Sequence, residues 1–487
     1  MQAPTFHIDE IRFLERPVEL RLPFRFGAVT VTHAPQAFVR VRIRLADGRA
    51  SWGAGAELMV PKWFDKSPEL SEAQSFDQLR ESLLIARDSY TADAQARTAF
   101  GHFAAHHQEI VEACCVHSLP PLVAAFGAAQ IDKAVLDALG HALDLSFFEL
   151  VRRNVAAIAP ETLLPEFGGF DFSAFAASLR PSPSLAVRHT VGMLDSITGQ
   201  APTGGDGLPV SLAEAIDAYG LHYFKIKLGG EIDHDLARLT EIASLLDARL
   251  PEYVVTLDGN EQYDALDALS LLWQRLESTA PLAHLCRRIA FIEQPVNRLQ
   301  ALEHDVTDMA RQIPIIIDES DASFDAFPRA RDLGYRGVSS KACKGLYKSL
   351  INRARCERWN AQGQQPPCFM TGEDLTTQAG LAVQQDLALA SLLGVVHVER
   401  NGHHYVNGFA GQHAPPVEQQ GFLAAHPALY ELTHGSVRLR LRNGTLALGS
   451  LAGSGFASAA QPEWSGMSSL RAPASKTLQR IPHAGSH

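Results

Sequence analysis

The sequence predicts an α/β protein in which an N-terminal α+β domain precedes a parallel (β/α) barrel. Short apolar runs alternate with helical patterns from residue 186 onward, and about eight of these runs have the length and β-branched content of buried strands. Five consecutive runs between residues 224 and 341 carry a lysine or an acidic residue at their ends, where a barrel assembles its active site. The 487 residues also exceed the usual limit for one hydrophobic core, so two domains are expected.

The order of patterns along the chain predicts where the domains divide. Residues 38–45 alternate apolar and basic side chains before an Asp-Gly turn, and residues 70–150 have helical periodicity. A stretch rich in Pro, Gly, Phe and Ser follows, and the end of the chain is rich in Ser, Ala and Pro. We therefore expect an α+β capping domain at 1–155, a connector at 156–185, the barrel at 186–405, a C-terminal segment returning to the cap at 406–456 and a flexible tail at 457–487.

The C-terminal segment contains two further short strand patterns. Residues 437–441 and 445–448 flank Asn443-Gly444, a sequence typical of a two-residue turn. They predict a hairpin outside the barrel, packed against the N-terminal domain.

Composition excludes several classes of protein. A net charge of −11 and a pI near 6.0 argue against a nucleic-acid binder, which normally presents a basic face. Six cysteines without regular spacing favour reduced thiols in the cytoplasm, and neither a secretory signal nor a membrane-spanning run is visible. We expect a cytoplasmic homo-oligomer that acts on a small molecule, without a nucleic-acid or membrane partner.

Three acidic residues end successive predicted strands and form the candidate metal site. Asp258, Glu293 and Asp318 are one strand–helix unit apart from one another, so a barrel would bring them together. Three converging carboxylates repel one another unless a cation lies between them, and Mg²⁺ prefers such oxygen ligands. The alternative is that each acid caps the helix that follows it, which would explain one of them better than all three.

Three lysines supply candidate acid/base groups. Lys225 and Lys227 are two residues apart on one strand and point to the same side, so each is expected to lower the pKa of the other towards about 7–8, where a lysine can act as a base. Lys341 ends a later strand and approaches from across the barrel. Two bases beside one carbon and a cation indicate removal of the proton α to a carboxylate, with the metal stabilising the enediolate. A lone Lys-x-Lys would more often be a solvated edge strand.

The ordered motifs resemble the enolase superfamily, in the branch of muconate lactonizing enzymes and dipeptide racemases. They are Lys-x-Lys at 225–227, Asp-x-Asn at 258–260, Phe-Ile-Glu-Gln-Pro at 291–295, Asp-Glu-Ser at 318–320 and Ser-x-Lys at 339–341. The resemblance implies a modified TIM barrel, (β/α)7β, under an α+β cap whose loops at 21–27 and 52–57 close over substrate. Sites of this superfamily use a Lys or His base with one or two Mg²⁺ ions.

The resemblance also implies a role for each matching residue. It makes Asp258, Glu293 and Asp318 the ligands of one Mg²⁺ per active site. Lys227 and Lys341 become opposing acid/base groups, and Lys225 gives electrostatic support. Residues implied near the metal or substrate are Asn260, Glu319, Glu373 and Glu399.

Departures from the family pattern leave the reaction open. Residues 368–374 contain no histidine, and residues 396–401 lack the Asp-x-Asp of dipeptide epimerases. Glu373 and Glu399 therefore suit either substrate contact or structural ion pairs. The expected activity is that of a racemase or epimerase. The alternatives are a dehydratase of a hydroxy or sugar acid, a cycloisomerase, and, in a different class, an inactive barrel used for binding or as a scaffold.

His102 and His106 are four residues apart on a predicted helix and superficially suggest zinc. The glutamate of a His-Glu-x-x-His motif is missing, so a cluster on the helix surface is expected instead.

Overall fold

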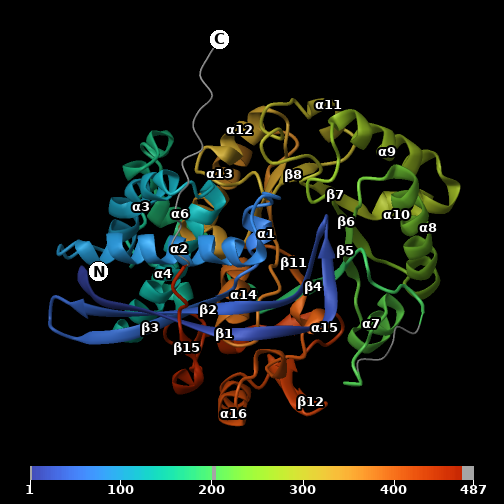
Figure 1. Cartoon of the computed structure of the whole chain (residues 1–487). Helices are drawn as coiled ribbons and strands as arrows, with labels where there is room; N and C mark the ends of the chain where they lie inside the picture. Colours follow the sequence, from blue (N-terminus) through green and yellow to red (C-terminus); the bar gives the residue numbers. More distant parts are fainter. Residues whose placement is uncertain (1–2, 200–204, 474–487) are drawn as a thin grey trace.

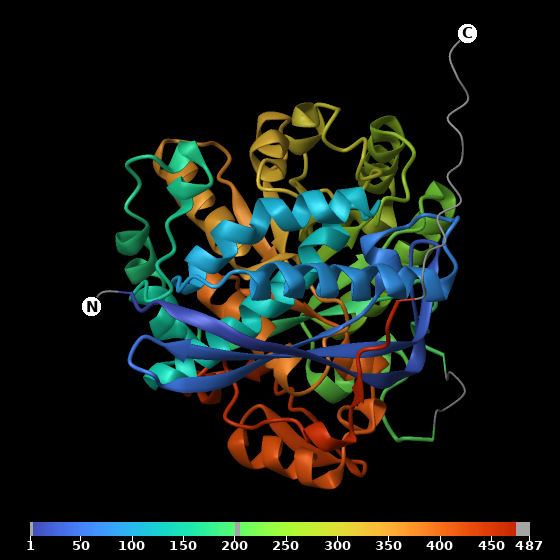
Figure 2. The same ribbon diagram turned by 60° about the vertical axis from the view of Figure 1, so that its left-hand side comes forward.

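A computed structural model describes residues 3–199 and 205–473 and shows an antiparallel sheet with helices beside a closed parallel barrel (Figure 1). Seen from 60° away, the sheet and its helices stand in front of the barrel (Figure 2). None of the described helices is both long and apolar enough to cross a bilayer.

The N-terminal cap is built on three long antiparallel strands, β1 (Phe6–Phe26), β2 (Val29–Leu45) and β3 (Ala50–Leu58). Alternate residues of β2, including Val39, Val41 and Ile43, are fully buried, as expected for a sheet with one covered face. The helices of the cap are α1 (Pro61–Phe64), α2 (Glu72–Ala92), α3 (Ala99–Val116), α4 (Pro121–Leu143) and α5 (Phe147–Arg152). Helix α4 crosses β3 so closely that a Cβ on Gly53 would lie 2.2 Å from the carbonyl oxygen of Ala134.

One buried acid makes the stability of the cap depend on pH. Burial raises the pKa of Asp132 on α4 to about 8, although the Tyr90 hydroxyl donates a hydrogen bond to it at 2.8 Å. Between about pH 4 and pH 8 the unfolded chain ionises this carboxyl while the folded chain retains its proton. The free energy of unfolding therefore falls as the pH rises, by up to about 1.4 kcal/mol per unit.

Asp132→Asn is accordingly expected to remove this loss, because asparagine can still accept from Tyr90 without titrating. Urea unfolding should find the variant more stable than the wild type at pH 8, and by less at pH 5. Asp88→Asn, at an exposed carboxylate of α2, is the control. An equal gain at both pH values would contradict the assignment.

The barrel closes through parallel pairing of its first and last strands, β4 and β11. Its strands are β4 (Ser184–Val191), β5 (Tyr223–Lys227), β6 (Val254–Asp258), β7 (Ile289–Glu293), β8 (Ile315–Ile317), β9 (Gly337–Ser340), β10 (Phe369–Gly372) and β11 (His397–Arg400). The intervening helices are α7 (Leu212–Tyr219), α8 (Ile232–Arg249), α9 (Leu266–Ser278), α10 (Ala283–Arg288), α11 (Thr307–Ala310), α12 (Ala326–Asp332), α13 (Leu346–Ala361) and α14 (Leu381–Leu393). The predicted barrel with an N-terminal α+β region is confirmed.

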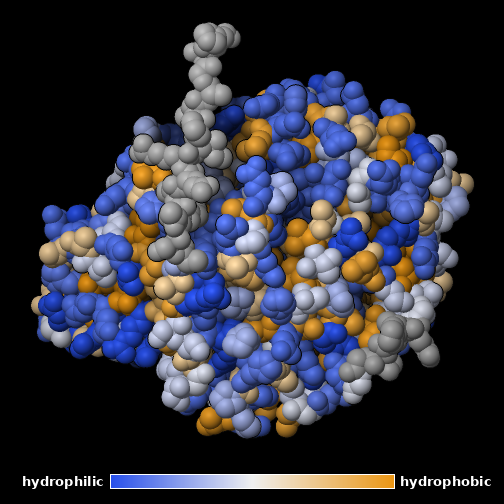
Figure 3. All heavy atoms as spheres, viewed as in Figure 1, coloured by the Kyte–Doolittle hydropathy of each residue, from blue (hydrophilic) through white to orange (hydrophobic). Residues whose placement is uncertain are grey.

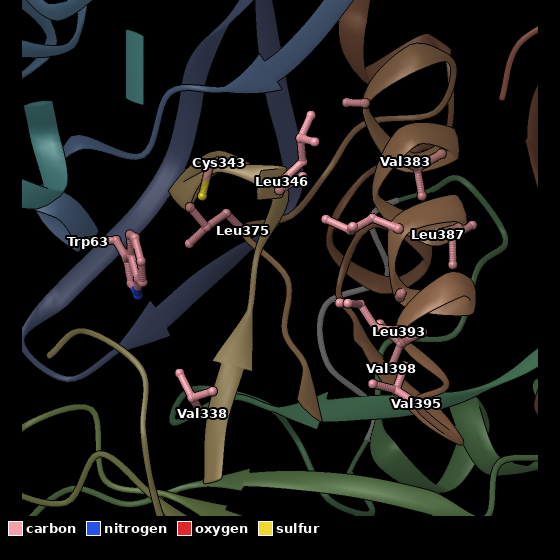
Figure 4. Close-up of a cluster of buried hydrophobic side chains, with 14 of the residues drawn as sticks. Trp63, Val338, Cys343, Leu346, Leu375, Val383, Leu387, Leu393, Val395 and Val398 are labelled. Atoms are coloured by element: carbon pink, nitrogen blue, oxygen red, sulfur yellow. The ribbon is translucent and has the colours of Figure 1, made fainter. Parts of the chain in front are cut away.

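Apolar side chains fill the space between the barrel wall and its outer helices. In the cluster of Figure 4, Val383 and Leu387 project from α14, Val398 lies on β11 near Leu393, and Leu346 begins α13 beyond β9. All five are at most 2% exposed. On the face shown in Figure 3, hydrophilic side chains cover most of the surface and hydrophobic ones are scattered among them. The burial of this layer holds the strand ends in fixed positions.

The predicted late hairpin is reduced to a single antiparallel bridge between Arg442 and Thr445. Strand β13 (Ser436–Leu439) pairs with β12 (Tyr430–Thr433), whereas β14 (Thr445–Ala447) pairs antiparallel with β4 at the outside of the barrel. The Asn443-Gly444 turn is present, with positive φ at both residues. Beyond the turn, β14 forms a three-residue ladder with β4 and none with β13.

The segment after the barrel contains α15 (Gly402–Tyr405) and α16 (Pro416–Ala425) and then runs back to the cap. Phe456 stacks on Phe147 of α5 with ring centroids 4.0 Å apart. Strand β15 (Ser468–Ser469) pairs with β1, so part of the predicted flexible tail belongs to the fold. The rest of that tail, 474–487, lies outside the described residues. The connector contains α6 (Phe172–Ser178).

Candidate active site

The three predicted lysines all lie inside the barrel mouth. Lys225 and Lys227 project from β5, and Lys341 follows the last residue of β9. Their exposed fractions are 1%, 5% and 4%. Because ammonium groups are rarely buried without partners, each must be held by a specific set of acceptors.

Lys225 lies at the centre of four carboxylates. Its Nζ is 2.9 Å from Asp258 Oδ2 and 2.8 Å from Glu293 Oε2, at the ends of β6 and β7. It is also 2.6 Å from Glu373 Oε2 and 3.0 Å from Glu399 Oε2, which lie at the ends of β10 and β11. The structure therefore brings two predicted metal ligands, Asp258 and Glu293, together with Glu373 and Glu399, whose roles the sequence left open.

The other two lysines each bind one of the predicted metal ligands. Lys227 Nζ donates to Asp258 Oδ2 at 2.6 Å, and Lys341 Nζ donates to Asp318 Oδ2. Lys344 lies 3.3 Å from Asp318 Oδ1 and so adds a second cation to this acid. The two acid/base candidates, Lys227 and Lys341, thus come from β5 and β9, and each binds a different carboxylate.

These acids reverse the predicted effect on the lysine pKa. Burial lowers the pKa of Lys225, but Asp258 and Glu293 outweigh it and hold this pKa well above its usual value. The pKa of Lys341 is likewise raised, because Asp318 outweighs burial. The expectation that neighbouring lysines depress the pKa of Lys225 is therefore wrong, since it left out the direct contacts of Lys225 with Asp258 and Glu293, to which Glu373 and Glu399 add.

Cap side chains close the site from above. Phe24 and Trp63 line a cavity of about 20 Å³ together with Lys225, Lys227 and Lys341. Lys341 Nζ lies 4.3 Å from the centre of the Trp63 ring, within the range of a cation–π contact. The cavity has room for about one water molecule, so a substrate can enter only when these aromatic side chains move.

The two predicted cap loops differ in how they meet the site. Phe24 and Phe26, within 21–27, line the cavity. Residues 52–57, however, belong to strand β3, where the whole segment pairs with β2, and the cavity is reached only from Leu58 onward. The role predicted for 52–57 is therefore wrong.

Ion pairs tie the cap to the barrel beside this cavity. Lys66 of the cap donates to the carbonyl oxygen of Asn260 at 2.7 Å and pairs with Glu261. Arg298, after β7, donates to the carbonyl oxygens of Trp63 and Phe64 at 2.9 Å. These contacts hold the backbone at Trp63 and Phe64 against the loops that follow β6 and β7.

Asn260 and Glu319 lie beside the predicted metal ligands. The Asn260 backbone N–H donates to Asp258 Oδ1 at 2.9 Å, and its side chain donates to Glu319 Oε1 at 3.3 Å. Asn260 has φ +41°, and Gln294, which follows Glu293, has φ +36°. Left-handed backbone at two successive strand ends is strained and is typical of functional sites.

Several buried oxygens of the site lack hydrogen-bond partners. They are Glu293 Oε1, Asn260 Oδ1 and Glu319 Oε2, whereas Glu293 Oε2 lies 2.8 Å from Lys225 Nζ. Burial, together with Asp258 and Glu373, raises the pKa of Glu293 well above its usual value. Buried oxygens without partners are the type of ligand that an oxygen-preferring divalent cation binds.

The predicted metal ligands nevertheless do not converge as a set. Among the described residues, three His, Cys, Asp or Glu side chains bring ligand atoms within 4.8 Å of one another only at Asp93, His102 and His106, in the cap. At the barrel mouth, the ammonium of Lys225 separates Asp258 from Glu293.

Residues 209–427 match the family model described as enolase C-terminal domain-like. The barrel of this chain is therefore similar to the C-terminal domain of enolase-superfamily proteins. The fold agrees with solved structures of the superfamily. The L-Ala-D/L-Glu epimerase from Bacillus subtilis is 16% identical with a TM-score of 0.56, and the match covers 90% of this chain and 97% of that one.

Two further solved structures share this enolase-superfamily fold. The dipeptide epimerase from Enterococcus faecalis V583, complexed with Mg and the dipeptide L-Leu-L-Tyr, is 16% identical with a TM-score of 0.57, and the match covers 93% of this chain and 99% of that one. The muconate lactonizing enzyme from Pseudomonas fluorescens, complexed with muconolactone, is 18% identical with a TM-score of 0.55, covering 96% and 97%. No curated protein sequence matches the chain.

Two positively charged side chains of this site were not predicted from the sequence. Arg188 on β4 is fully buried and pairs with Glu373, and Lys344 pairs with Asp318 and Asp321. Arg188 occupies an inward-facing position of a predicted strand. This position was the only feature of the sequence that could have indicated its place in the site. Arg400, by contrast, pairs with Asp374 and Asp386 away from Lys225.

Proposed function

We propose that this chain is an Mg²⁺-dependent enzyme that removes the α-proton of a carboxylate substrate, as a racemase or epimerase. One observation carries the proposal: Lys227 and Lys341 come from different sides of the barrel and line the same closed cavity. A carbon held between two amines can lose a proton to one and regain it from the other, which inverts its configuration.

The chain's own residues would position and protect this proton transfer. Lys227 and Lys341 hold or accept the proton at Nζ, each oriented by one carboxylate. Lys225 stays charged among its four acids and contributes fixed positive charge beside the substrate carboxylate. Phe24 and Trp63 exclude water from the closed cavity.

The residues proposed to hold Mg²⁺ are Asp258, Glu293 and Asp318. The unpartnered Oε1 of Glu293 supports this assignment, and Asn260 and Glu319 add oxygens near the acids. When bound, Mg²⁺ would supply positive charge that polarises the substrate carboxylate and competes with the lysines for these acids.

The proposal is tested by deuterium exchange at the α-carbon across a library of small carboxylates in D₂O, with Mg²⁺ and with EDTA. Exchange with inversion, dependent on Mg²⁺, is the expected result. Glu293→Gln should lower the Mg²⁺-dependent rate at least about 100-fold, because it removes a proposed ligand. Glu303→Gln, at a glutamate outside the site, is the control and should leave the rate unchanged.

The other outcomes separate the alternatives. Loss of water or ring closure after exchange would assign a dehydratase or a cycloisomerase, in which one lysine removes the proton and the other assists. Absence of exchange with every substrate, together with a binding partner that tolerates Lys227→Ala, would favour an inactive scaffold.

We also propose a cytoplasmic homo-oligomer divided into a cap at 1–155 and a barrel at 186–405. All six cysteines are free, which supports a reducing compartment. The cap sheet and the barrel sheet share no strand in the described chain, which supports the division.

A further inference from the structure

A second group of chemically reactive side chains lies in the cap, away from the lysine-lined cavity. Asp93 ends α2, while His102 and His106 project from α3. The prediction of a surface cluster is wrong, since these histidines are 0% and 5% exposed. One ligand atom from each of the three residues lies within 4.8 Å of the other two.

The hydrogen bonds of His102 fix its tautomer. Its Nε2 lies 2.9 Å from the carbonyl oxygen of Phe6 on β1. A carbonyl only accepts hydrogen bonds, so the proton of this ring is on Nε2. Nδ1 therefore carries a bare lone pair, and it is buried without a partner. Burial also lowers the pKa of His102, which keeps the ring neutral.

His106 is oriented in a matching way. Its Nδ1 lies 3.2 Å from Ser89 Oγ, which is 3.1 Å from Glu109 Oε2. The single hydroxyl proton of Ser89 goes to the carboxylate, so Ser89 accepts from Nδ1–H of His106. The lone pair of Nε2 then faces Asp93 Oδ2 at 3.3 Å, without a hydrogen bond between them. Two acceptors at this distance call for a cation between them.

We propose that Asp93, His102 and His106 form a binding site for a divalent transition metal of the Zn²⁺ type. Two imidazoles four residues apart on one helix face and a carboxylate are a ligand set that suits Zn²⁺, with a fourth position left for water. Arg97 donates to Asp93 Oδ2 at 2.6 Å and the Gln95 backbone N–H to Oδ1 at 2.9 Å, which orients this carboxylate.

The position of the site indicates a structural role. It joins the end of α2 to α3, and through Phe6 it reaches the start of β1, which also pairs with Arg97. It shares no residue with the lysine-lined cavity. A bound ion would therefore stabilise the cap sheet and its helices without entering the reaction.

The test is titration of the metal-stripped, full-length protein with Zn²⁺ and with Co²⁺ in saturating Mg²⁺, which blocks the acids at the barrel mouth. One equivalent should bind to the wild type, raise its thermal unfolding temperature and give the visible spectrum of nitrogen-ligated Co²⁺. His106→Gln should weaken binding at least about 100-fold. His117→Gln, at an exposed histidine that ends the same helix and binds Glu81, should bind like the wild type.

Asp93→Asn provides a second variant in case His106→Gln does not fold, because asparagine can keep the bond from Arg97. It should also lose Co²⁺ affinity. Wild-type protein that binds no Zn²⁺, or unchanged affinity in a folded His106 or Asp93 variant, would overturn the proposal. Neither result bears on α-proton exchange, so the two proposals fail independently.

Discussion

Replacing Lys227 or Lys341 by methionine is expected to stop net inversion of the substrate. In the proposed mechanism each lysine serves one face of the carbon, and loss of a positioned acid/base group costs about 10²–10⁴-fold in rate. Methionine preserves much of the side-chain volume while removing the amine. The measurement is inversion of each pure enantiomer in D₂O, followed by NMR.

The two variants should differ in which enantiomer they still exchange, and this difference identifies the face of the carbon that each lysine serves. With Lys341 removed, Lys227 can still exchange the α-proton of one enantiomer, and Lys341 alone should exchange that of the other. Lys62→Met, at a cap lysine that binds the carbonyl oxygens of Ser67 and Leu70, is the control and should keep full activity. If one variant lost exchange with both enantiomers while the other kept both, a single-base lyase or cycloisomerase would replace the racemase.

The barrel and its site could be predicted because the signal is local. Each strand is a short apolar run with a charge at its end, and closure of a parallel barrel brings those ends to one face. Lys225 contacts Asp258, and Lys341 contacts Asp318, at the ends of these strands. The order of the strands in the chain was enough to place them.

The pKa values and the cap site depend on contacts that no local pattern encodes. The charge of Lys225 is held by Asp258 and Glu293 together with Glu373 and Glu399, and the last two reach it only because β11 closes the barrel against β4. The burial of His102 depends on which face of α3 meets β1. Helical spacing shows that His102 and His106 share a face of the helix. Their packing against Phe6 and Asp93 depends on the tertiary structure, which the local sequence does not specify.

Replacing Lys225 by methionine is expected to destabilise the fold by about 3–5 kcal/mol, because four buried carboxylates would lose their common counter-charge. Lys227→Met should cost less, since Lys227 pairs with Asp258 alone. Urea unfolding in EDTA measures both, and equal losses would contradict the central role of Lys225. Addition of Mg²⁺ then tests whether the lost positive charge, and not the changed shape of the side chain, causes the loss of stability. If the proposed ligands bind Mg²⁺, the ion should restore stability to Lys225→Met more than it stabilises the wild type, because it replaces the missing positive charge.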